Sequence, residues 1–100
     1  MRNLNFLNEK FDEYTVQMVW QKGIILIGHD PNHVRKDICG ALIYRKDYGN
    51  TNSPNGWEID HIVPKSKGGS DDLNNLQPLQ WKNNRSKGDD YPARNFCIRK

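Results

Sequence analysis

Short blocks of hydrophobic and polar residues alternate along this chain, and their spacing predicts two helices and several short strands. Residues 11–22 predict the first helix, because apolar side chains recur on one face, Asp12 can cap the start and Gly23 can follow the end. The buried face of this helix is expected to hold Tyr14, Met18 and Val19.

Weaker patterns surround this first helix. Residues 1–10 are mostly polar and are expected to fray. The apolar run 24–27 predicts a short buried extended segment, and residues 39–44 predict a second strand. Residues 47–56 are dense in turn-forming side chains, so this segment is expected to be a surface loop.

Residues 57–89 have the most informative pattern in the chain. A β-branched, apolar run predicts a strand over 57–63, and a loop with two consecutive glycines follows it. A brief extended pair then leads to a polar helix over 78–87, where Pro78 suits the first turn and Gly88 suits the end. We therefore expect an α+β protein in which a strand–loop–strand–helix unit follows an N-terminal helical appendage.

Composition and charge limit the size of the folded unit and the kind of partner. The chain has 100 residues, of which 35% are hydrophobic, so we expect one domain over 1–100 with a small core. Residues 1–30 contain three basic and four acidic side chains, whereas residues 31–100 contain twelve and eight. A basic excess around the 57–89 block fits a phosphate-rich partner.

The two cysteines, Cys39 and Cys97, predict no thiolate metal site, because neither belongs to a Cys-x-x-Cys pair. They are able to form a disulfide, but no apolar signal segment begins the chain and no apolar run is long enough to span a bilayer. We therefore expect a cytoplasmic protein with free, unreactive thiols and no membrane partner.

The functional groups in the 57–89 block suit the cleavage of a phosphodiester. Asp60 and Asn84 offer a carboxylate and an amide oxygen, which are hard ligands suited to Mg²⁺ or Mn²⁺. His61 can accept a proton from an attacking water. Lys87 shares a helical face with Asn84. Because neighbouring side chains on a strand face opposite ways, a bend between Asp60 and His61 is expected to bring both to one site.

This block resembles the HNH endonuclease family, and residues 35–37, 39–41 and 48–50 upstream resemble its small phage and bacterial members less specifically. The three letters of the family name would fall on His61, Asn75 and Asn84, which are 14 and 9 positions apart, as in the family. Asp-His-Ile-x-Pro, the glycine pair, Asn-Leu and Asn-x-x-Lys also match, so the resemblance covers about a third of the chain strongly. It implies a ββα-metal (His-Me) finger over 57–89, which we call the finger.

By this resemblance, Asp60 and Asn84 would hold one divalent cation, Mg²⁺ or Mn²⁺, and His61 would be the general base. Asn75 would tie the loop and help to hold His61 in place. The substrate would be DNA, cleaved to leave 5′-phosphate and 3′-hydroxyl ends. Lys87 is expected to support cleavage from the helix. The basic residues near the motif that are expected to contact phosphates are Arg85, Lys87, Lys82, Lys65 and Lys67.

One departure from the family concerns a structural zinc. Many members bind zinc through two Cys-x-x-Cys pairs, whose places correspond here to Lys36 with Cys39 and to Gln80 with Asn83. Three of the four thiols are missing, so we expect no structural zinc and expect apolar packing to support the finger.

Two other interpretations stay open. The protein could be a nucleic-acid-binding or packaging accessory that keeps the finger but needs a partner to cleave, although intact Asp60, His61 and Asn84 argue against a purely structural finger. It could also be an RNA-directed or toxin nuclease, which nothing in the sequence separates from a DNA nuclease. Trp57 and Trp81 are expected to be packing residues rather than base-stacking platforms. The oligomeric state stays open.

Overall fold

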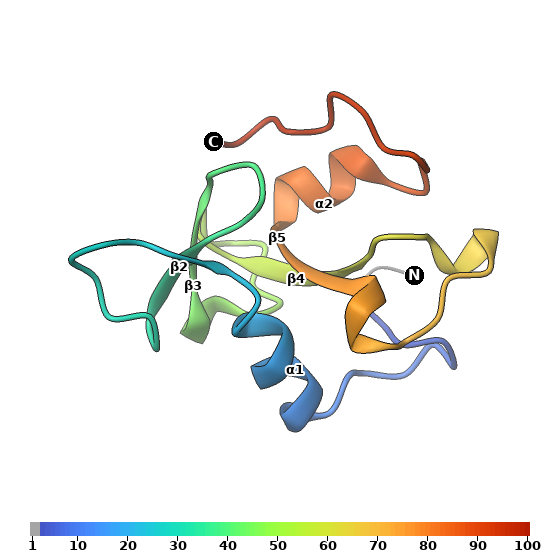
Figure 1. Cartoon of the computed structure of the whole chain (residues 1–100), viewed down its shortest axis with the longest axis horizontal. Coiled ribbons are helices and arrows are strands. Elements are labelled where there is room, and N and C mark those ends of the chain that lie inside the picture. The colour runs from blue at the N-terminus through green and yellow to red at the C-terminus, as the bar shows by residue number, and fades with distance from the viewer. Residues whose placement is uncertain (1–2) are drawn as a thin grey trace.

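The computed structural model describes residues 3–100 and contains two short α-helices and two antiparallel sheets (Figure 1). The helices and strands, in chain order, are α1 (Glu13–Trp20), β1 (Ile24–Ile25), β2 (Val34–Lys36), β3 (Leu42–Tyr44), β4 (Trp57–His61), β5 (Leu76–Gln80) and α2 (Trp81–Lys87). The 3₁₀ turns are η1 (Arg45–Asp47), η2 (Lys65–Lys67) and η3 (Leu73–Asn75). The expected α+β class is confirmed. Within the described residues, no helix has the length and apolar character that crossing a membrane requires.

The β4–β5 hairpin lies between the two helices (Figure 1). Side chains alternate between the faces of a strand, so the two faces of β4 meet different neighbours. Trp57 and Ile59 pack into the apolar core beside α1. Glu58 and Asp60 face α2 and bond to its side chains. This hairpin and α2 form the expected strand–loop–strand–helix unit, whereas the part before it contains a sheet as well as a helix.

Helix α1 supplies one wall of the core. It begins after Asp12, whose side chain accepts a hydrogen bond from the Thr15 backbone N–H at 2.8 Å, as the sequence predicts. Its buried residues are Val16, Val19 and Trp20. Tyr14 was expected on this face but is 69% exposed, so that expectation is wrong. The ring of Trp20 packs against Trp57, with centroids 5.3 Å apart.

The three-stranded sheet differs most from what the sequence predicts. Strands β1, β2 and β3 pair in that order, and β1 is an edge strand. Ile24 and Ile25 in β1 are 50% and 58% exposed, so the expected buried segment is wrong. Strand β2 has the sequence Val-Arg-Lys and gives no apolar signal. The third strand begins at Leu42 rather than residue 39, because a turn occupies residues 37–40.

Pro78 lies in β5 and not in the first turn of a helix, as the sequence pattern suggested. Strand β5 pairs only with β4 within the described chain. Proline has no backbone N–H, and it fits at a position of β5 whose backbone nitrogen faces away from β4, because no hydrogen bond is lost there. Helix α2 begins three positions later than expected, and the Gln80 side chain caps it by accepting from the Lys82 and Asn83 N–H groups. Gly88 follows its end, as predicted.

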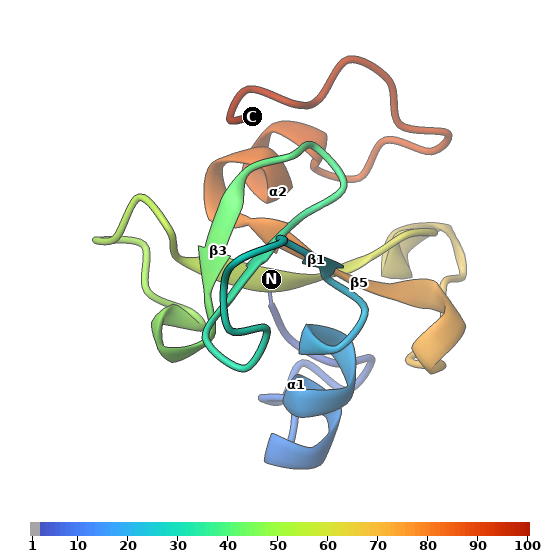
Figure 2. The same cartoon turned by 60° about the vertical axis from the view of Figure 1, so that its left-hand side comes forward.

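The N-terminal segment, residues 3–10, lies against the finger instead of fraying (Figure 2). The Asn3 side chain accepts a hydrogen bond from the Ile59 backbone at 2.9 Å. The Lys65 ammonium donates to a backbone carbonyl of the segment at 3.0 Å. The expectation of fraying is therefore wrong for these residues, and residues 1–2 lie outside the described part of the chain.

Cys39 and Cys97 form a disulfide, with Cα atoms 5.5 Å apart, so the expectation of free thiols is wrong. The bond fastens the C-terminal segment to the turn between β2 and β3, beside α2 (Figure 2). The two residues are 58 positions apart in the sequence, and only the tertiary fold brings them together. Persistent disulfides are typical of oxidising compartments, so this bond does not support the expected cytoplasmic location.

Candidate active site

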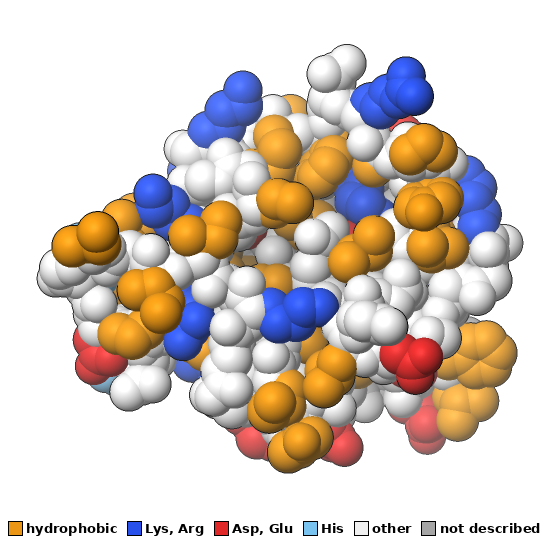
Figure 3. All heavy atoms as spheres, viewed as in Figure 1, with side chains coloured by type: hydrophobic (Ala, Val, Ile, Leu, Met, Phe, Trp, Pro, Cys, Tyr) orange, Lys and Arg blue, Asp and Glu red, His pale blue; other side chains and the backbone are white. Residues whose placement is uncertain are grey.

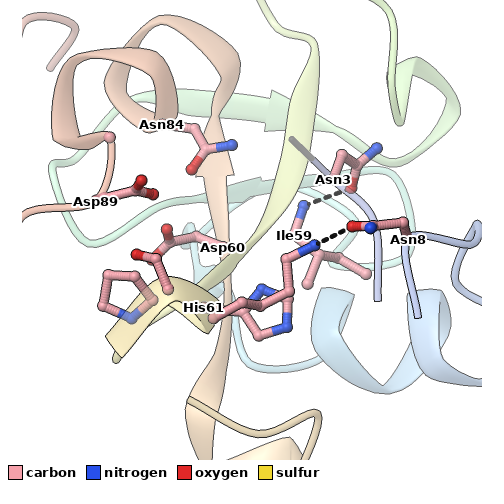
Figure 4. Close-up of a pocket in the computed structure, with 11 residues that line it drawn as sticks. Asn3, Asn8, Ile59, Asp60, His61, Asn84 and Asp89 are labelled. Atoms are coloured by element: carbon pink, nitrogen blue, oxygen red, sulfur yellow. Dashed lines mark hydrogen bonds between the residues drawn. The ribbon is translucent and has the colours of Figure 1, made fainter. Parts of the chain in front are cut away.

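A polar pocket of about 170 Å³ lies at the end of β4 (Figure 4). Asp60 and His61 from β4 line it together with Asn84 from α2. The N-terminal segment and η2 supply further polar walls, including Asn8 and Lys65. Three of the residues that the sequence singled out therefore come together, from two elements that are distant in the sequence.

Asp60 and His61 reach this pocket without the expected bend between them. Both residues pair in regular register with β5, and the strand ends after His61. Their side chains leave β4 on opposite faces, yet both line the pocket, because it lies where the strand ends. The expected bend is therefore wrong, although both side chains still share one site.

The Asp60 carboxylate is held by two side chains and is only 5% exposed. One oxygen accepts a hydrogen bond from the Lys87 ammonium at 3.1 Å, and the other accepts from the Gln77 amide at 2.9 Å. Burial raises the pKa of Asp60 above its ordinary value, while the bonds from Gln77 and Lys87 act in the opposite direction. The carboxylate is therefore fixed in orientation, and a proton competes for it at higher pH than for an exposed aspartate.

Asn84 presents its amide oxygen to the pocket. Its amide nitrogen donates to a Glu58 carboxylate oxygen at 2.9 Å, and both side chains are buried. The amide oxygen forms no hydrogen bond within the described chain, and Figure 4 shows it on the side of Asp60 and Asp89. Glu58 thus orients the amide so that an oxygen, and not a nitrogen, faces the pocket.

The His61 ring is held through one of its nitrogens and is 8% exposed. Nε2 lies 2.8 Å from a carboxylate oxygen of Asp71, and the ring packs 5.9 Å from the ring of Phe11, between centroids. Nδ1 forms no hydrogen bond among residues 3–100. The second nitrogen is therefore free to contact a water or a substrate.

Asn75 fastens the loop that follows β4. Its side chain accepts from the Val63 N–H at 2.8 Å and donates to the Val63 and Ser70 carbonyls at 3.1 and 2.8 Å. The same loop passes so close to Gly69 that a Cβ there would lie 1.7 Å from the Val63 carbonyl oxygen. Asn75 lines no part of the pocket, so its contacts act on the loop between His61 and Asp71.

Lys87 is buried, with 3% of its surface exposed, and its ammonium points inward to Asp60 and to the His61 carbonyl at 3.0 Å. This placement favours an ion pair inside the finger over a contact with DNA phosphate. The sequence could not distinguish these two roles, because both need a lysine on the same face of α2 as Asn84.

The other basic residues have different surroundings. Lys65 is bound to the N-terminal segment, and Lys67 is exposed. Lys82 and Arg85 lie 5.5 and 5.6 Å from the ring of Trp81. In the space-filling view, Lys and Arg side chains are frequent over α2 and the C-terminal segment, whereas Asp and Glu gather near α1 (Figure 3). On the face shown, basic side chains are therefore more frequent on the α2 side than on the α1 side.

Sequence reasoning missed three acidic side chains around the pocket. Glu58 carried a signal, because it lies two positions before Asp60 and therefore on the same face of the strand. Asp89 lines the pocket just after the glycine that ends α2. Asp71 carried no signal, since only the folded loop brings it to His61.

Two oxygen donors of the pocket are chemically suited to a divalent cation. The described residues contain no group of three or more His, Cys, Asp or Glu side chains arranged to hold a metal ion. Asp60 and the free oxygen of Asn84 are two hard ligands, which is a number typical of Mg²⁺ sites that keep several waters.

The places that correspond to the zinc ligands of other HNH proteins hold a polar network instead of the expected apolar packing. Asp37 is buried there and accepts hydrogen bonds from the Gln80 backbone and the Asn83 amide, at 2.9 and 3.0 Å. Asn83 also accepts from two backbone N–H groups of the C-terminal segment, both at 2.8 Å. With the disulfide of Cys39, these bonds connect α2, the β2–β3 turn and the chain end.

Comparison with known proteins identifies the family of this chain. The family model for the HNH endonuclease matches residues 38–90, which include the whole finger and the disulfide cysteine of the β2–β3 turn. No curated protein and no solved structure matches the chain significantly. The match covers more than half of the chain, and on this ground the protein belongs to the HNH endonuclease family.

Proposed function

We propose that this protein is a metal-dependent endonuclease that hydrolyses phosphodiester bonds of DNA. The observation that carries the proposal is the convergence of Asp60, His61 and the free amide oxygen of Asn84 on one polar pocket. Membership of the HNH endonuclease family supports nuclease activity in general, and these side chains are our candidates for carrying it out.

Asp60 and Asn84 would hold one divalent cation, Mg²⁺ or Mn²⁺. Lys87 and Gln77 fix the carboxylate and Glu58 fixes the amide, so both ligands are oriented before the cation binds. When bound, such a cation stabilises the charge that develops on the phosphate and the leaving oxygen.

His61 would act as the general base through Nδ1. Nε2 is engaged by Asp71, and the free nitrogen is the one able to take a proton from a water beside the pocket. Asn75 would support this step from a distance by fixing the loop after β4. Lys87 would act on Asp60 rather than on the DNA backbone.

The DNA backbone would approach the basic side of the molecule near α2. Arg85, Lys82 and Lys67 are the candidates for phosphate contacts, since their charged groups are closer to solvent than that of Lys87. Arg85 is also 3.4 Å from Glu58, so an incoming phosphate would compete with this carboxylate.

Incubation of supercoiled plasmid with the protein, with and without Mg²⁺ or Mn²⁺, tests the proposal. Nicked or linear DNA should form only when a cation is present. A His61→Ala variant with the same circular dichroism spectrum as the wild type should not produce nicked or linear DNA. Absence of cleavage with either cation, together with retained DNA binding, would favour the accessory protein that needs a partner. Cleavage of RNA in preference to DNA would instead identify an RNA-directed nuclease.

A further inference from the structure

We propose that Asp71 is a positioning residue for His61, holding the ring so that Nδ1 is the nitrogen presented to the pocket. This inference rests on the proposed function and names a residue that the HNH motif does not include. Asp71 lies in the loop after η2, ten positions from His61 in the sequence.

The contact between the two side chains is short and partly shielded. Asp71 Oδ1 lies 2.8 Å from His61 Nε2, and the two side chains are 36% and 8% exposed. An ionised carboxylate can only accept, so Nε2 carries the hydrogen, and in the neutral ring Nδ1 then keeps its lone pair. Asp71 therefore selects the tautomer and the ring orientation together.

The other groups around the ring cannot select the same tautomer. Asp60 leaves β4 on the opposite face and is engaged by Lys87 and Gln77. Lys65 lines the pocket but donates to the N-terminal segment. Phe11 offers only an aromatic face, and Asp89 lines the pocket without a hydrogen bond to the ring. The hold on Nε2 thus depends on Asp71.

Asp71 is itself held in place. Both of its carboxylate oxygens accept from the Phe6 backbone N–H, at 3.0 and 2.9 Å. On the loop side, the neighbouring Ser70 carbonyl accepts from Asn75 at 2.8 Å. The carboxylate is therefore fixed by the N-terminal segment and by the loop, which is the arrangement that a positioning group requires.

The size of the effect follows from what positioning can supply. Loss of a group that orients a metal-bound histidine typically lowers affinity or activity about 10- to 100-fold, and we expect a comparable effect for a group that orients His61. A substrate contact would change KM, but Asp71 does not line the pocket. Loss of Asp71 should therefore lower kcat by about 10- to 100-fold and leave KM within about twofold.

Asp71→Ala and Asp71→Asn test the inference, with Asp72→Ala as the matched control. Asp72 is the adjacent exposed aspartate, and its side chain makes no cap hydrogen bond. Two readouts are needed: kcat and KM for plasmid nicking at saturating cation, and the ¹⁵N chemical shifts of the His61 ring in the metal-free protein. The shifts report which ring nitrogen carries the hydrogen.

We expect Asp71→Ala to lose kcat and to change from one tautomer to a mixture, while Asp72→Ala changes neither. Asp71→Asn keeps one acceptor oxygen and should lie between, and it serves if Asp71→Ala does not fold. Unchanged ring shifts, or a loss of kcat that Asp72→Ala shares, would overturn the inference. An inactive wild-type protein would instead refute the proposed function, and the ring shifts would still decide whether Asp71 holds His61.

Discussion

Asp60 and Lys87 form an ion pair in which both side chains are almost wholly buried, with 5% and 3% of their surfaces exposed. Burial of two charges costs desolvation free energy, which their attraction only partly repays. The pair therefore adds little net stability compared with an uncharged pair, but each charge offsets the desolvation cost of burying the other inside the finger.

Lys87→Met should lower the free energy of unfolding by about 3–5 kcal/mol, because it leaves the Asp60 carboxylate buried without its cation. The double variant Asp60→Asn, Lys87→Met removes both charges and should regain part of that loss. Urea unfolding of the variants measures this, with Lys82→Met as the control at a more exposed position of the same helix. A double variant no more stable than Lys87→Met would contradict this account of the pair.

His61→Ala should lower the cleavage rate by about 10²- to 10⁴-fold, since a positioned general base contributes that much. Its circular dichroism and DNA affinity should stay close to those of the wild type. His33→Ala is the matched control, because the His33 side chain is 77% exposed and lies outside the pocket. Near-normal turnover of His61→Ala would exclude His61 as the base.

Affinity for Mn²⁺ should fall as the pH is lowered towards the pKa of the Asp60 carboxyl, because protons compete with the cation for this group. Burial raises the pKa of Asp60 above 3.8, so protons displace the cation from this carboxylate at a higher pH than from an ordinary aspartate. Calorimetric titration of the DNA-free protein at several pH values measures the effect. Asp60→Asn should bind weakly at every pH, and a pH-independent affinity of the wild type would rule out Asp60 as a ligand.

The individual residues of the site could be predicted where they belong to a local pattern. Asp60, His61 and Asn84 stand out in the sequence through a local motif that resembles the HNH family, and the structure brings these three side chains to one pocket. The partners that orient them, Glu58 and Asp71, could not be predicted in the same way. Their roles depend on side chains from other elements, which a single sequence does not place.

At the scale of the elements, the loop between β4 and β5 positions several side chains of the candidate site. It contains little regular structure, yet it carries Asp71 to His61 and contains η2, which lines the pocket. The Asn75 side chain replaces a strand ladder with three hydrogen bonds across the loop.

Asn75→Ala should lower the free energy of unfolding by about 1–3 kcal/mol, because it leaves partly buried backbone groups of Val63 without partners. It should also slow cleavage less than His61→Ala does. Asn74→Ala, at the exposed neighbouring position, is the control and should change neither property. Urea unfolding and plasmid nicking measure the two effects, and equal losses in both variants would show that the Asn75 contacts are not responsible.

Element boundaries were predicted best where capping chemistry decides them. Asp12 and Gly88 mark helix ends because their backbone or side-chain chemistry acts locally. Pro78 misled the prediction, since its fixed φ suits a helix start and also a strand that pairs on one side only. The exposure of β1 could not be read from its isoleucines, because burial depends on what packs over a strand.

In the whole molecule, the disulfide connects the β2–β3 turn with the C-terminal segment beside α2, and it uses Cys39, one of the four positions that correspond to the zinc ligands of many HNH proteins. A crosslink that closes a long loop stabilises mainly by restricting the unfolded chain. Here the bonded residues are 58 positions apart, and the closed loop contains the whole finger because residues 57–89 lie between Cys39 and Cys97.

Replacing both cysteines with serine should lower the free energy of unfolding by about 2–4 kcal/mol. The pocket should keep its geometry, because neither cysteine lines it, so cleavage should persist at temperatures where the variant stays folded. Urea unfolding with and without reductant measures this. Reductant should destabilise the wild type and leave the serine variant unchanged, and an equal effect on both would show that the bond is not the cause.

The closed loop also determines how the molecule would carry a mechanical load. A stretching force applied to the two ends of the chain would pass from the N-terminal side to Cys39, cross the sulfur–sulfur bond and leave through the last residues after Cys97. The backbone from residue 40 to residue 96 would lie outside this path, so the tension would bypass β4, β5 and α2. Under oxidising conditions β4, β5 and α2 would therefore carry no load, whereas the N-terminal segment, which supplies Asn3 and Asn8 to the pocket, would be pulled away from them first. A reductant would extend the load to the backbone of residues 40–96.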